Sequence, residues 1–554
     1  MPLTLPSAPA DFPRSLEYPE APVGSILAGA ARRYGARTAF IHGKTQVSYD
    51  YVYRAARRFA NALVGHGIGR GDTVAVHLPN CLAYPVAYYG ILLSGATFSP
   101  ANPLLPPDDL AAQLADCGAV AVVTFGPAAG VVEAIVDRTS VRLVVVSSPA
   151  TALTERQVEF EEFYAEQLDD RPDVEIDIRH DLAHLAYTGG TTGRSKGVQL
   201  PHRNVVVNAL QYACWASGSI PAVDEAGNPI LDQTGDPDEW PTRHGTGLAI
   251  NLTPWFHAMG TIAALNVPVL TGTTVVLHDR FVPVAYLADV EKLRATSIGG
   301  APALFAALLA CPDFQTRDLS SVVGLGSGAA PLAHEMINAL RARFPDASIT
   351  EGYGLTEVTM GATVGPTYRS GVRKVGSVGL PIFDTEIKIV PADGGEEPLP
   401  ANTSGEVCIR GPQVMTGYRN RPEETTAALV DGWLHTGDIG VLDDDGYLSI
   451  VDRKKDMLLY KGYNVYPREL EELLIAHPAV AATAVVGRRN DDVGELPVAF
   501  VVKTPGQDVD AETLMTDVNA KLAPYKKIRE VRFVEEIPVS AAGKILKRQL
   551  REQL

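Results

Sequence analysis

A short segment rich in glycine and hydroxyl side chains carries the clearest chemical signal in the sequence. Residues 187–198 read YTGGTTGRSKGV and follow a strand-like apolar run at 182–187. Glycine lets backbone N–H groups approach phosphate oxygens, threonine hydroxyls donate hydrogen bonds, and Lys196 supplies positive charge. A Walker A loop would need glycine at Ser195 and serine or threonine at Gly197. The segment therefore predicts a different polyphosphate cradle, and the alternative is a mobile glycine-rich linker.

This loop resembles the phosphate-binding signature of the adenylate-forming superfamily, which comprises acyl-CoA synthetases, firefly-type luciferases and peptide-synthetase adenylation domains. Its usual wording is Y-T-S-G-T-T-G-x-P-K-G, and further signatures follow in the superfamily's order between about Val47 and Leu550. Gly189, Ser195 and Ala542 depart from the usual serine, proline and serine. None of these departures deletes a charge, so we expect altered loop stiffness and retained activity. The resemblance implies that ATP phosphates are held by Thr188, Gly190, Thr191, Thr192, Gly193 and Lys196.

Two further segments resemble the stretches that enclose the adenine ring in this superfamily. Residues 351–357 read EGYGLTE, in which Tyr353 offers a stacking surface, Thr356 a phosphate donor and Glu357 a hard oxygen ligand for Mg²⁺. Residues 327–332 read SGAAPL. The resemblance implies that the backbone of this second segment lies against the opposite face of the ring, at Ala329, Ala330 and Pro331.

The last quarter of the chain contributes candidate ribose, hinge and thiol residues. Residues 433–440, WLHTGDIG, contain Asp438, whose carboxylate is suited to accept hydrogen bonds from both ribose hydroxyls. Arg453 would reach the same ribose, and Lys455 occupies the superfamily's hinge position, where a charged residue can be solvated in two orientations. Gly462, in YKGYNVYP, resembles the glycine that keeps the pantetheine passage narrow but open, and a simple tight turn is the alternative.

Two segments complete the candidate catalytic set. Residues 251–260, NLTPWFHAMG, resemble the segment that places an aromatic or histidine side chain at the acyl-pocket wall, which maps to His257, with a core histidine as the alternative. Residues 538–548, PVSAAGKILKR, resemble the C-terminal signature that ends in a catalytic lysine, here Lys544. Its ammonium would neutralise charge that develops between the carboxylate and the α-phosphate, and acetylation, which this P-x-x-x-x-G-K context permits, would remove that charge. The implied catalytic residues are Lys544, Glu357, Thr192 and His257.

Together these residues imply an AMP-forming acid–thiol ligase that uses ATP, Mg²⁺ and CoA. In the first half-reaction a carboxylate attacks the α-phosphorus of ATP and yields acyl-AMP and pyrophosphate. In the second, the small C-terminal domain turns about Lys455 and a thiol, preferably that of CoA, attacks the acyl-adenylate. The chain ends ten residues after Lys544, which disfavours a peptide-synthetase module. CoA phosphates could meet a basic cluster, alternatively a solvated face, at Lys521, Lys526, Lys527, Arg529 and Arg532.

Two other functions stay open at this point. One is a stand-alone adenylating enzyme that passes its acyl group to a carrier protein or leaves thiolation to a separate ligase. The other is a catalytically silent protein that binds acyl nucleotides, which the joint presence of Lys544, Glu357, Asp438 and Arg453 opposes.

The acid is expected to be larger than acetate, because small residues surround the predicted pocket and leave volume for a bulky, aromatic, alicyclic or long acyl group. No lysine or arginine evidently enters this pocket to hold a second carboxylate. The wording YKGYNVYPREL also resembles that of fatty-acid, alicyclic and aryl acid CoA ligases. The small residues are Gly299, Gly300, Gly326, Ser327, Gly328, Gly361 and Ala362.

Composition limits the compartment and the partners. The 554 residues carry 48 Lys plus Arg and 65 Asp plus Glu, and the net charge of −17 argues against nucleic-acid binding. Five widely spaced cysteines without a C-x-x-C pattern disfavour a zinc site and a disulfide framework. No signal-peptide pattern or membrane-spanning apolar run is present. We predict a cytoplasmic protein with no integral membrane segment; a carboxylic acid and CoA are its expected partners, and a homodimer or an acyl-carrier protein are further candidates.

The elements that must position these residues alternate between helix-like periodicity and short β-branched runs. Helices are expected at 49–63 and 84–93, and strands at 73–78, 119–125 and 141–146. Such alternation predicts βαβ units and an α/β fold with parallel sheets.

A change of pattern near residue 452 marks the expected domain boundary. We predict a large N-terminal multi-subdomain α/β domain at 1–452, a hinge at 453–455 and a small mobile C-terminal α+β domain at 456–554. The small domain is expected to hold helices at 466–476 and 512–522 and strands at 480–486 and 498–502. The polar segment 217–247 is interpreted as a surface excursion.

Overall fold

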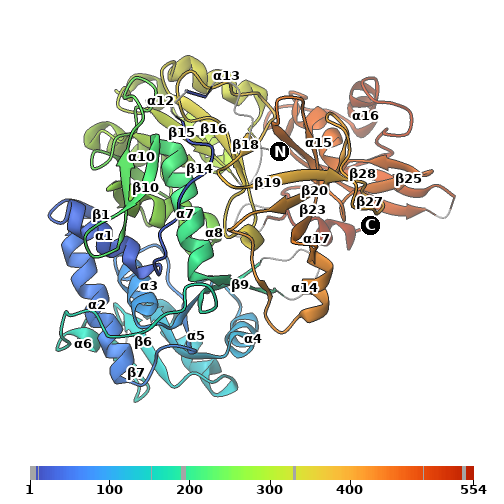
Figure 1. Ribbon diagram of the computed structural model, residues 1–554. Coiled ribbons are helices and arrows are strands. Elements are labelled where there is room, and N and C mark those ends of the chain that lie inside the picture. The colour runs from blue at the N-terminus through green and yellow to red at the C-terminus, as the bar shows by residue number, and fades with distance from the viewer. Residues whose placement is uncertain are drawn as a thin grey trace. The chain divides into compact units, whose positions relative to one another are not determined.

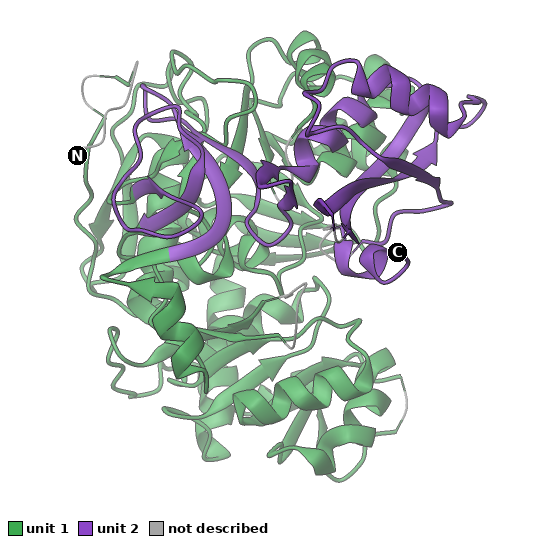
Figure 2. Cartoon of the chain, turned by 90° about the vertical axis from the view of Figure 1, so that its right-hand side faces the viewer, with its two compact units in different colours: residues 1–189, 195–386, 410–434 green, residues 190–194, 387–409, 435–554 purple. Residues whose placement is uncertain are grey.

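The computed structural model describes residues 8–9, 12–150, 152–188, 195–328, 332–490, 492–539 and 545–554. The chain divides into two compact units, which Figure 2 colours separately. Unit 1 comprises residues 1–189, 195–386 and 410–434, and unit 2 comprises residues 190–194, 387–409 and 435–554. Parallel strands dominate the large sheets and helices accompany them (Figure 1), so the predicted α/β class is confirmed.

An eight-stranded sheet carries the phosphate-loop segment. Its order is β21-β9-β8-β4-β3-β5-β6-β7, and the strands from β8 to β7 pair in parallel, whereas β9 runs antiparallel to β8 and β21. The central strand β3 is buried along its whole length, as expected for an apolar run inside a parallel sheet. The strands are β3 (Thr73–Val76), β4 (Thr97–Pro100), β5 (Ala119–Phe125), β6 (Leu143–Ser147), β7 (Gln157–Glu159), β8 (Leu182–Tyr187), β9 (Gly197–Pro201) and β21 (Gly417–Tyr418).

A nine-stranded sheet carries the predicted adenine and acyl segments. Its order is β18-β17-β16-β15-β14-β12-β13-β1-β2, with parallel pairing from β16 to β1 and antiparallel strands at both edges. The strands are β1 (Thr38–His42), β2 (Thr45–Ser48), β12 (Leu248–Asn251), β13 (Thr274–Leu277), β14 (Ser297–Gly300), β15 (Gly324–Ser327), β16 (Ser348–Tyr353), β17 (Thr363–Val364) and β18 (Leu380–Pro381).

Helix α7 (His202–Ser217) packs against the chain that follows β16, and Figure 1 shows it in green through the middle of unit 1. Its buried amides are satisfied by backbone, because Asn208 Nδ2 donates to Gly361 O at 3.0 Å and Gln211 Nε2 to Phe383 O at 2.5 Å. Among the helices of the described residues, none combines the length and apolarity needed to cross a membrane. The other helical segments of unit 1 are α1 (Gly24–Tyr34), α2 (Tyr49–Gly65), α3 (Ala83–Leu93), α4 (Pro107–Cys117), α5 (Gly126–Ile135), η1 (Val136–Arg138), α6 (Phe160–Tyr164), α8 (Ala258–Thr261), η2 (Ile262–Asn266), α9 (Val267–Thr271), α10 (Pro283–Leu293), α11 (Pro302–Leu309), α12 (Asp313–Thr316), α13 (His334–Arg343), η3 (Thr356–Val358) and α14 (Pro422–Ala428).

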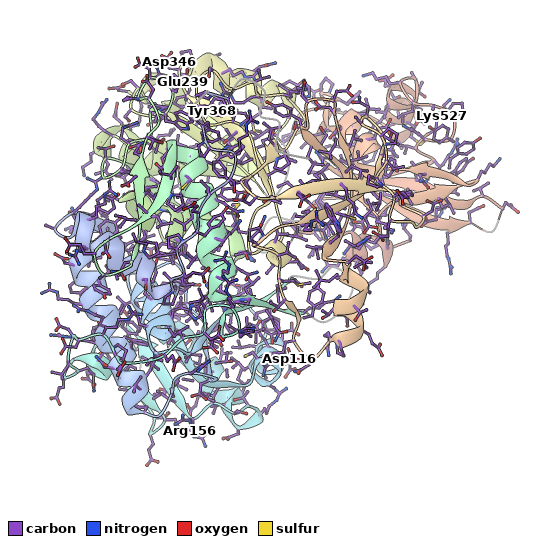
Figure 3. All side chains as sticks on the ribbon, in the orientation of Figure 1. Asp116, Arg156, Glu239, Asp346, Tyr368 and Lys527 are labelled. Carbon is purple, nitrogen blue, oxygen red and sulfur yellow. The ribbon has the colours of Figure 1, made fainter. Side chains whose placement is uncertain are left out.

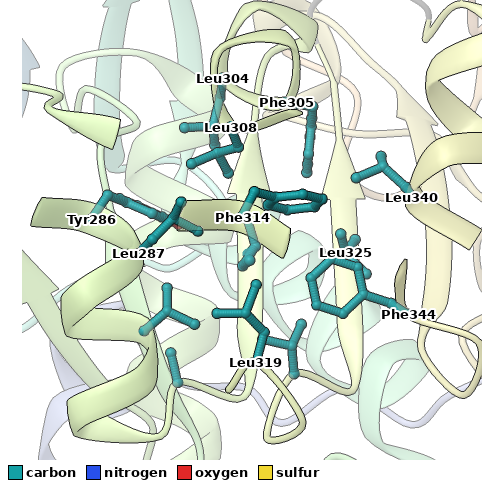
Figure 4. Packing of buried hydrophobic residues seen from close by; sticks show 14 of the residues in the cluster. Tyr286, Leu287, Leu304, Phe305, Leu308, Phe314, Leu319, Leu325, Leu340 and Phe344 are labelled. Atoms are coloured by element: carbon teal, nitrogen blue, oxygen red, sulfur yellow. The ribbon is translucent and has the colours of Figure 1, made fainter. Parts of the chain in front are cut away.

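One large hydrophobic cluster supports the strands of the nine-stranded sheet. Figure 4 shows Phe314 among leucines and aromatic rings that come from helices α10, α11 and α13 and from β15. Phe314 and Phe344 meet edge to face, with ring centroids 5.8 Å apart. Full burial of each such side chain stabilises the fold by roughly 1.5–3 kcal/mol, so this cluster fixes the strands whose ends carry the site.

Unit 2 contains most of one five-stranded sheet and the whole of another. The first sheet is built from β19 (Glu386–Val390), β20 (Gly405–Arg410), β22 (Leu429–Val430), β23 (Trp433–Leu442) and β24 (Leu448–Arg453). The second consists of β25 (Leu458–Tyr460), β26 (Tyr463–Val465), β27 (Val480–Asn490), β28 (Gly494–Lys503) and β29 (Glu530–Phe533), with α15 (Pro467–Ile475), α16 (Ala511–Asn519) and α17 (Lys547–Arg551). The predicted hinge at 453–455 begins at the last residue of β24 and ends before β25. Together with the predicted domain bounds, it stays a prediction.

The elements predicted from periodicity are confirmed, with differences at their ends. Strand β5 has the predicted bounds, and α2, α3, α15 and α16 differ from them by one to three residues at an end. The two strands predicted at 480–486 and 498–502 are longer in the structure, since β27 and β28 form a continuous antiparallel hairpin from Val480↔Lys503 to Asn490↔Gly494. The polar Arg-Arg-Asn end of β27 concealed this extension, because a solvated strand end lacks an apolar signal.

The interpretation of 217–247 as a surface excursion is wrong. The segment forms the antiparallel hairpin β10 (Ser219–Val223) and β11 (Pro229–Gln233), and it contributes the fully buried ring of Trp240. Trp240 stacks on Phe12 with ring centroids 5.3 Å apart and meets Tyr368 at 5.5 Å. A single aromatic anchor therefore fixes a segment whose composition is otherwise that of a loop.

A carboxylate adds a second anchor beside that ring. Glu239 accepts hydrogen bonds from Ser370 N at 3.0 Å and Ser370 Oγ at 2.8 Å. Figure 3 labels Glu239 and Tyr368 next to each other in unit 1.

We predict that Trp240→Ala lowers the free energy of unfolding by about 3–5 kcal/mol, because it removes a fully buried ring and leaves a cavity. Val223→Ala in the same hairpin, where the side chain is 52% exposed, should stay within about 0.5 kcal/mol of the wild type. Urea unfolding followed by tryptophan fluorescence and circular dichroism measures both. Equal, small effects would show that the segment is not anchored.

Candidate active site

The described residues of the phosphate-loop segment, Thr188, Ser195 and Lys196, lie between strands β8 and β9. Thr188 N donates to Lys196 O at 3.1 Å, and the Ser195 hydroxyl donates to Thr188 O. Both ends of the loop are thereby held one residue beyond the last strand pair, Tyr187↔Gly197. The predicted phosphate ligands Gly190, Thr191, Thr192 and Gly193 lie outside the described residues.

A third strand supports this hairpin. Strand β21 pairs with β9 through Tyr418↔Val198, and Arg419 N donates to Gly197 O at 2.8 Å. The Tyr418 ring lies under the lysine of the loop, with Lys196 Nζ 4.8 Å from the ring centroid. Sequence reasoning did not find Tyr418, because strand pairing between distant parts of the chain puts it here.

Tyr418 also reaches the predicted metal ligand. Its hydroxyl donates to Glu357 Oε1 at 2.8 Å, and burial together with this carboxylate raises the pKa of Tyr418. Glu357 lies in η3, and its backbone oxygen accepts Met415 N at 2.8 Å. The structure therefore connects Lys196 and Glu357, two residues that the sequence predicted separately.

The other predicted nucleotide and acyl segments leave the same edge of the nine-stranded sheet. Parallel register aligns Gly300 with Ser327 and Ser327 with Glu351, and β12 lies next to β14. Segments 251–260, 327–332 and 351–357 all follow or overlap the carboxyl ends of these strands. Ligands of open α/β sheets bind at such carboxyl ends. Of the predicted adenine contacts, Ala329, Ala330 and Pro331 lie outside the described residues.

The turn after β16 requires a glycine. A Cβ on Gly354 would lie 1.9 Å from Met360 O, a distance that no side chain can adopt. This close approach folds the chain back at once, so that Tyr353, Thr356 and Glu357 follow one another within a single tight turn and short helix. Glu351 supports the turn from below by accepting Leu332 N at 2.9 Å.

His257 stands immediately before α8, and its ring lies against that of Phe256, with centroids 4.5 Å apart. The loop that carries it is clamped by Asn80, which donates to Thr253 O at 2.9 Å and accepts Trp255 N at 2.8 Å. Asn80 follows strand β3, so the eight-stranded sheet positions this loop of the nine-stranded sheet. The sequence offered no signal for Asn80.

The small residues of the predicted acyl pocket differ in the space beside them, and whether they line a pocket stays a prediction. A Cβ on Gly326 would meet no atom of the described residues within 4 Å, and one on Gly299 would make only an ordinary contact. At Gly361 the space is taken by Tyr212, whose hydroxyl would lie 1.9 Å from a Cβ and donates to Thr363 O at 3.0 Å. The space at Gly300 is likewise filled, by a leucine of α11.

The predicted ribose residues face each other across β23 and β24. Asp438 pairs in register with Arg453, and Arg453 Nε lies 3.4 Å from Asp438 Oδ1. Asp438 is buried and Arg453 is partly exposed, so the buried carboxylate lies next to a guanidinium that solvent can reach. This geometry suits a pair of hydroxyl donors that approach from the arginine side.

Within the predicted hinge, Lys454 makes an ion pair and a backbone hydrogen bond to residues that precede the hinge. Lys454 Nζ binds Glu406 at 2.8 Å and Lys454 N donates to Gly437 O at 2.9 Å. Burial, and then the charge of Arg453, lower the pKa of the neighbouring Lys455. Glu406 is a further residue that sequence reasoning missed.

Gly462 forms a tight turn between β25 and β26. Both central residues of this turn have positive φ, +51° at Lys461 and +82° at Gly462, which is the pattern of a type I′ hairpin. A Cβ on Gly462 would meet no atom of the described residues within 4 Å. The tight turn is therefore real, and the open space beside it leaves the predicted thiol passage compatible with the structure.

The predicted catalytic lysine, Lys544, lies outside the described residues. The chain on either side of it forms an antiparallel bridge between Val539 and Ile545.

The donor set around Glu357 fits Mg²⁺. No group of three or more His, Cys, Asp or Glu side chains gathers anywhere in the described part of the chain. A single carboxylate suits Mg²⁺, which usually takes one or two protein carboxylates and completes its shell with phosphate oxygens and water.

A lysine at the end of a glycine-rich segment and a carboxylate, joined through Tyr418, are the features expected of an enzyme that binds a nucleoside polyphosphate. The chain belongs to the AMP-binding enzyme family, whose model matches residues 27–419, and the model of the AMP-binding enzyme C-terminal domain matches residues 469–544. The resemblance to the adenylate-forming superfamily is confirmed.

Similar proteins include CoA ligases for different acids. The chain is 34% identical to a long-chain-fatty-acid–CoA ligase of Bacillus subtilis, over 98% of this chain and 97% of that protein, and 36% identical to 4-coumarate–CoA ligase 2 of Oryza sativa, over 98% and 91%. The crystal structure of ATP-bound MatB from Rhodopseudomonas palustris superposes with a TM-score of 0.83 at 28% identity, covering 96% of this chain and 98% of that one.

Proposed function

We propose that this protein is an AMP-forming acid–thiol ligase, which converts a carboxylic acid, ATP and CoA into an acyl-CoA, AMP and pyrophosphate. The observation that carries the proposal is the connection of Lys196 to Glu357 through Tyr418, at the edge where the adenine and acyl segments meet. Membership of the AMP-binding enzyme family and 34–36% identity to CoA ligases over nearly the whole chain support it.

In the first half-reaction a carboxylate oxygen attacks the α-phosphorus, and the bond from that phosphorus to the bridging oxygen of pyrophosphate breaks. Lys196 and the loop hydroxyls Thr188, Thr191 and Thr192 hold the phosphates, together with the glycine N–H groups of the loop. Thr356 donates to a phosphate, and Glu357 would hold Mg²⁺, which neutralises phosphate charge. Lys544 then stabilises the charge on the α-phosphate.

The nucleoside contacts are assigned to two groups of residues. Tyr353 stacks on the adenine, whose other face rests on the backbone at residues 329–331, and Asp438 with Arg453 binds the ribose hydroxyls. The Asp438–Arg453 register in β23 and β24 supports this assignment.

In the second half-reaction the CoA sulfur attacks the acyl carbon, a C–S bond forms, the C–O bond to the phosphate breaks, and AMP leaves with loss of the thiol proton. The turn at Gly462 lines the passage for the pantetheine arm, and the domain that carries it turns at Lys455. An enzyme that hands its acyl group to a carrier protein is the second candidate, because the same thioester chemistry serves a carrier-protein thiol.

The CoA nucleotide has an aromatic and basic surface available on unit 2. Tyr463, 58% exposed, stacks on Tyr525 with centroids 4.8 Å apart, and Arg529 lies over Tyr460 at 5.1 Å. Of the basic cluster predicted here, Lys526 is bound to Glu469 and Arg532 to Glu530. We therefore assign phosphate binding to Lys521, Lys527 and Arg529.

The acid is proposed to be apolar and larger than acetate. His257 forms the pocket gate, Gly299 and Gly326 leave the walls open, and Tyr212 limits the depth at Gly361. A cytoplasmic location and a homodimer remain predictions from the sequence.

A panel of aliphatic, aromatic and alicyclic acids in an ATP–pyrophosphate exchange assay tests this function. We expect exchange with at least one apolar acid, and thioester formation when CoA is added. Exchange without thioester would favour the carrier-protein alternative. Absence of exchange with every acid, in a chain that binds ATP, would refute the proposal.

Lys544→Ala should abolish pyrophosphate exchange while leaving thioester formation from supplied acyl-AMP largely intact, because the ammonium acts only where charge develops on the α-phosphate. Lys455→Pro should leave pyrophosphate exchange intact and slow thioester formation, since proline restricts the backbone rotation of a hinge. Equal loss of both half-reactions in Lys544→Ala, or failed adenylation in Lys455→Pro, would remove these assignments.

The substitution Gly462→Asn distinguishes the role of Gly462 in the tight turn from its proposed role in the thiol passage. Asparagine tolerates positive φ, so the free energy of unfolding should change by about 0.5 kcal/mol or less, whereas Gly462→Ala should cost roughly 1–2 kcal/mol. The added side chain enters the open space beside Gly462, and we expect thioester formation to slow at least about tenfold, close to 1.4 kcal/mol, with adenylation unchanged. Single-turnover measurements of the two steps check this. An unchanged thioester rate would leave Gly462 a turn residue only.

A further inference from the structure

The lysine of the phosphate loop already has an anionic partner in this structure. Lys196 Nζ lies 2.5 Å from Glu424 Oε2, and both side chains are about 40% exposed, at 39% and 41%. Glu424 is in the first turn of α14, and its other oxygen is 3.6 Å from Arg421 Nε. Neither Glu424 nor Arg421 belongs to any motif that the sequence singled out.

Two further contacts hold this pair in place. The Tyr418 ring supports Lys196 from one side at 4.8 Å. Helix α14 is tied to the same strand, because Tyr418 N donates to Thr425 Oγ1 at 2.9 Å. Lys196, Tyr418 and Glu424 therefore occupy one rigid corner at the base of the phosphate loop.

An ion pair of this kind is easily exchanged. Partly exposed pairs between a lysine and a single carboxylate contribute little net stability, because water solvates the separated charges well. A triphosphate brings several negative charges and can also accept from the loop N–H groups, so it competes effectively for the same ammonium.

We propose that Glu424 is a stand-in anion for the nucleotide: it holds Lys196 in place in the nucleotide-free enzyme and gives it up to the β- and γ-phosphates when ATP binds. Glu424 is thus a positioning residue that acts through Lys196 and sets the affinity for triphosphate over monophosphate. The inference rests on the proposed ATP site.

Glu424→Gln tests the exchange, because it keeps the shape of the side chain and removes the competing charge. We expect the affinity for ATP, measured by isothermal titration calorimetry without acid substrate, to rise about threefold to tenfold. The gain should shrink as salt is raised, since exposed charges are screened. Affinity for AMP, which has no β- or γ-phosphate, should be unchanged.

The neighbouring carboxylate provides a matched control. Glu423 lies in the same first turn of α14 and is exposed, so Glu423→Gln changes the net charge equally and should leave ATP affinity unchanged. In a Lys196→Met background the effect of Glu424→Gln should disappear. A weaker or unchanged ATP affinity in Glu424→Gln, an equal gain in Glu423→Gln, or an equal gain for AMP would overturn the inference.

The same titrations separate this inference from the proposed function. A wild-type chain that does not bind ATP contradicts the proposed function itself. A wild-type chain that binds ATP, with Glu424→Gln indistinguishable from it, contradicts only the role of Glu424.

Discussion

The hydrogen bond from Tyr418 to Glu357 joins the two large sheets of unit 1 at the site. Tyr418 belongs to a strand of the eight-stranded sheet and Glu357 follows a strand of the nine-stranded sheet. Each sheet carries only some of the proposed nucleotide-binding residues: Lys196 immediately precedes a strand of the eight-stranded sheet, and Tyr353 and Glu357 lie at or just after the end of a strand of the nine-stranded sheet. The relative position of these parts depends on this contact, and the clamp of Asn80 on the His257 loop fixes the same junction a second time.

Local chemistry could be predicted from the sequence, whereas contacts made by distant strand pairing could not. Residue types within a few positions are enough to predict three segments: the glycine-rich loop, the turn at Tyr353 and the strand that carries Asp438. Tyr418, by contrast, belongs to no recognised motif. Only the pairing of β21 with β9 shows that it lies beside Lys196. Gly361 shows that a small residue in the sequence does not by itself predict open space. In the structure, the side chain of Tyr212 fills the space beside it.

Trp240 illustrates the same limit for the fold. Its segment has the composition of a loop, and only the ring partners that tertiary folding brings together, Phe12 and Tyr368, make it part of the core. Periodicity succeeded where one face of an element is buried along its length, as in α2 and β5. It failed for 217–247, where the buried residues, such as Ser219, Leu231 and Trp240, are spaced irregularly among polar ones.

The net charge of a chain says little about whether it can bind a polyanion, because binding depends on the charges close to the site. A net charge of −17 would repel a polyphosphate at long range, yet Lys196 sits within reach of a phosphate loop, and the exchangeable carboxylate of Glu424 beside it lowers the local charge only while the site is empty. The predicted small domain is nearly neutral, with 14 basic and 15 acidic residues from Asp456 onward. Screening confines long-range repulsion to about 10 Å, so the local set of groups decides binding.

The contacts around residues 450–456 indicate what a turn at Lys455 would have to break. Lys454 is bound to Glu406 and Gly437, and all three precede Lys455, so a rotation at Lys455 would leave these contacts intact. Arg468 is different, because it lies beyond the hinge and donates from its backbone to Asp452 and from its guanidinium to Ile450 O at 2.8 Å. Asp456 N and Met457 N also donate across Lys455, both to Arg453 O. The proposed rotation about Lys455 would separate the two Arg468 contacts, and a difference in the binding of ATP and CoA between the two states would have to offset that cost.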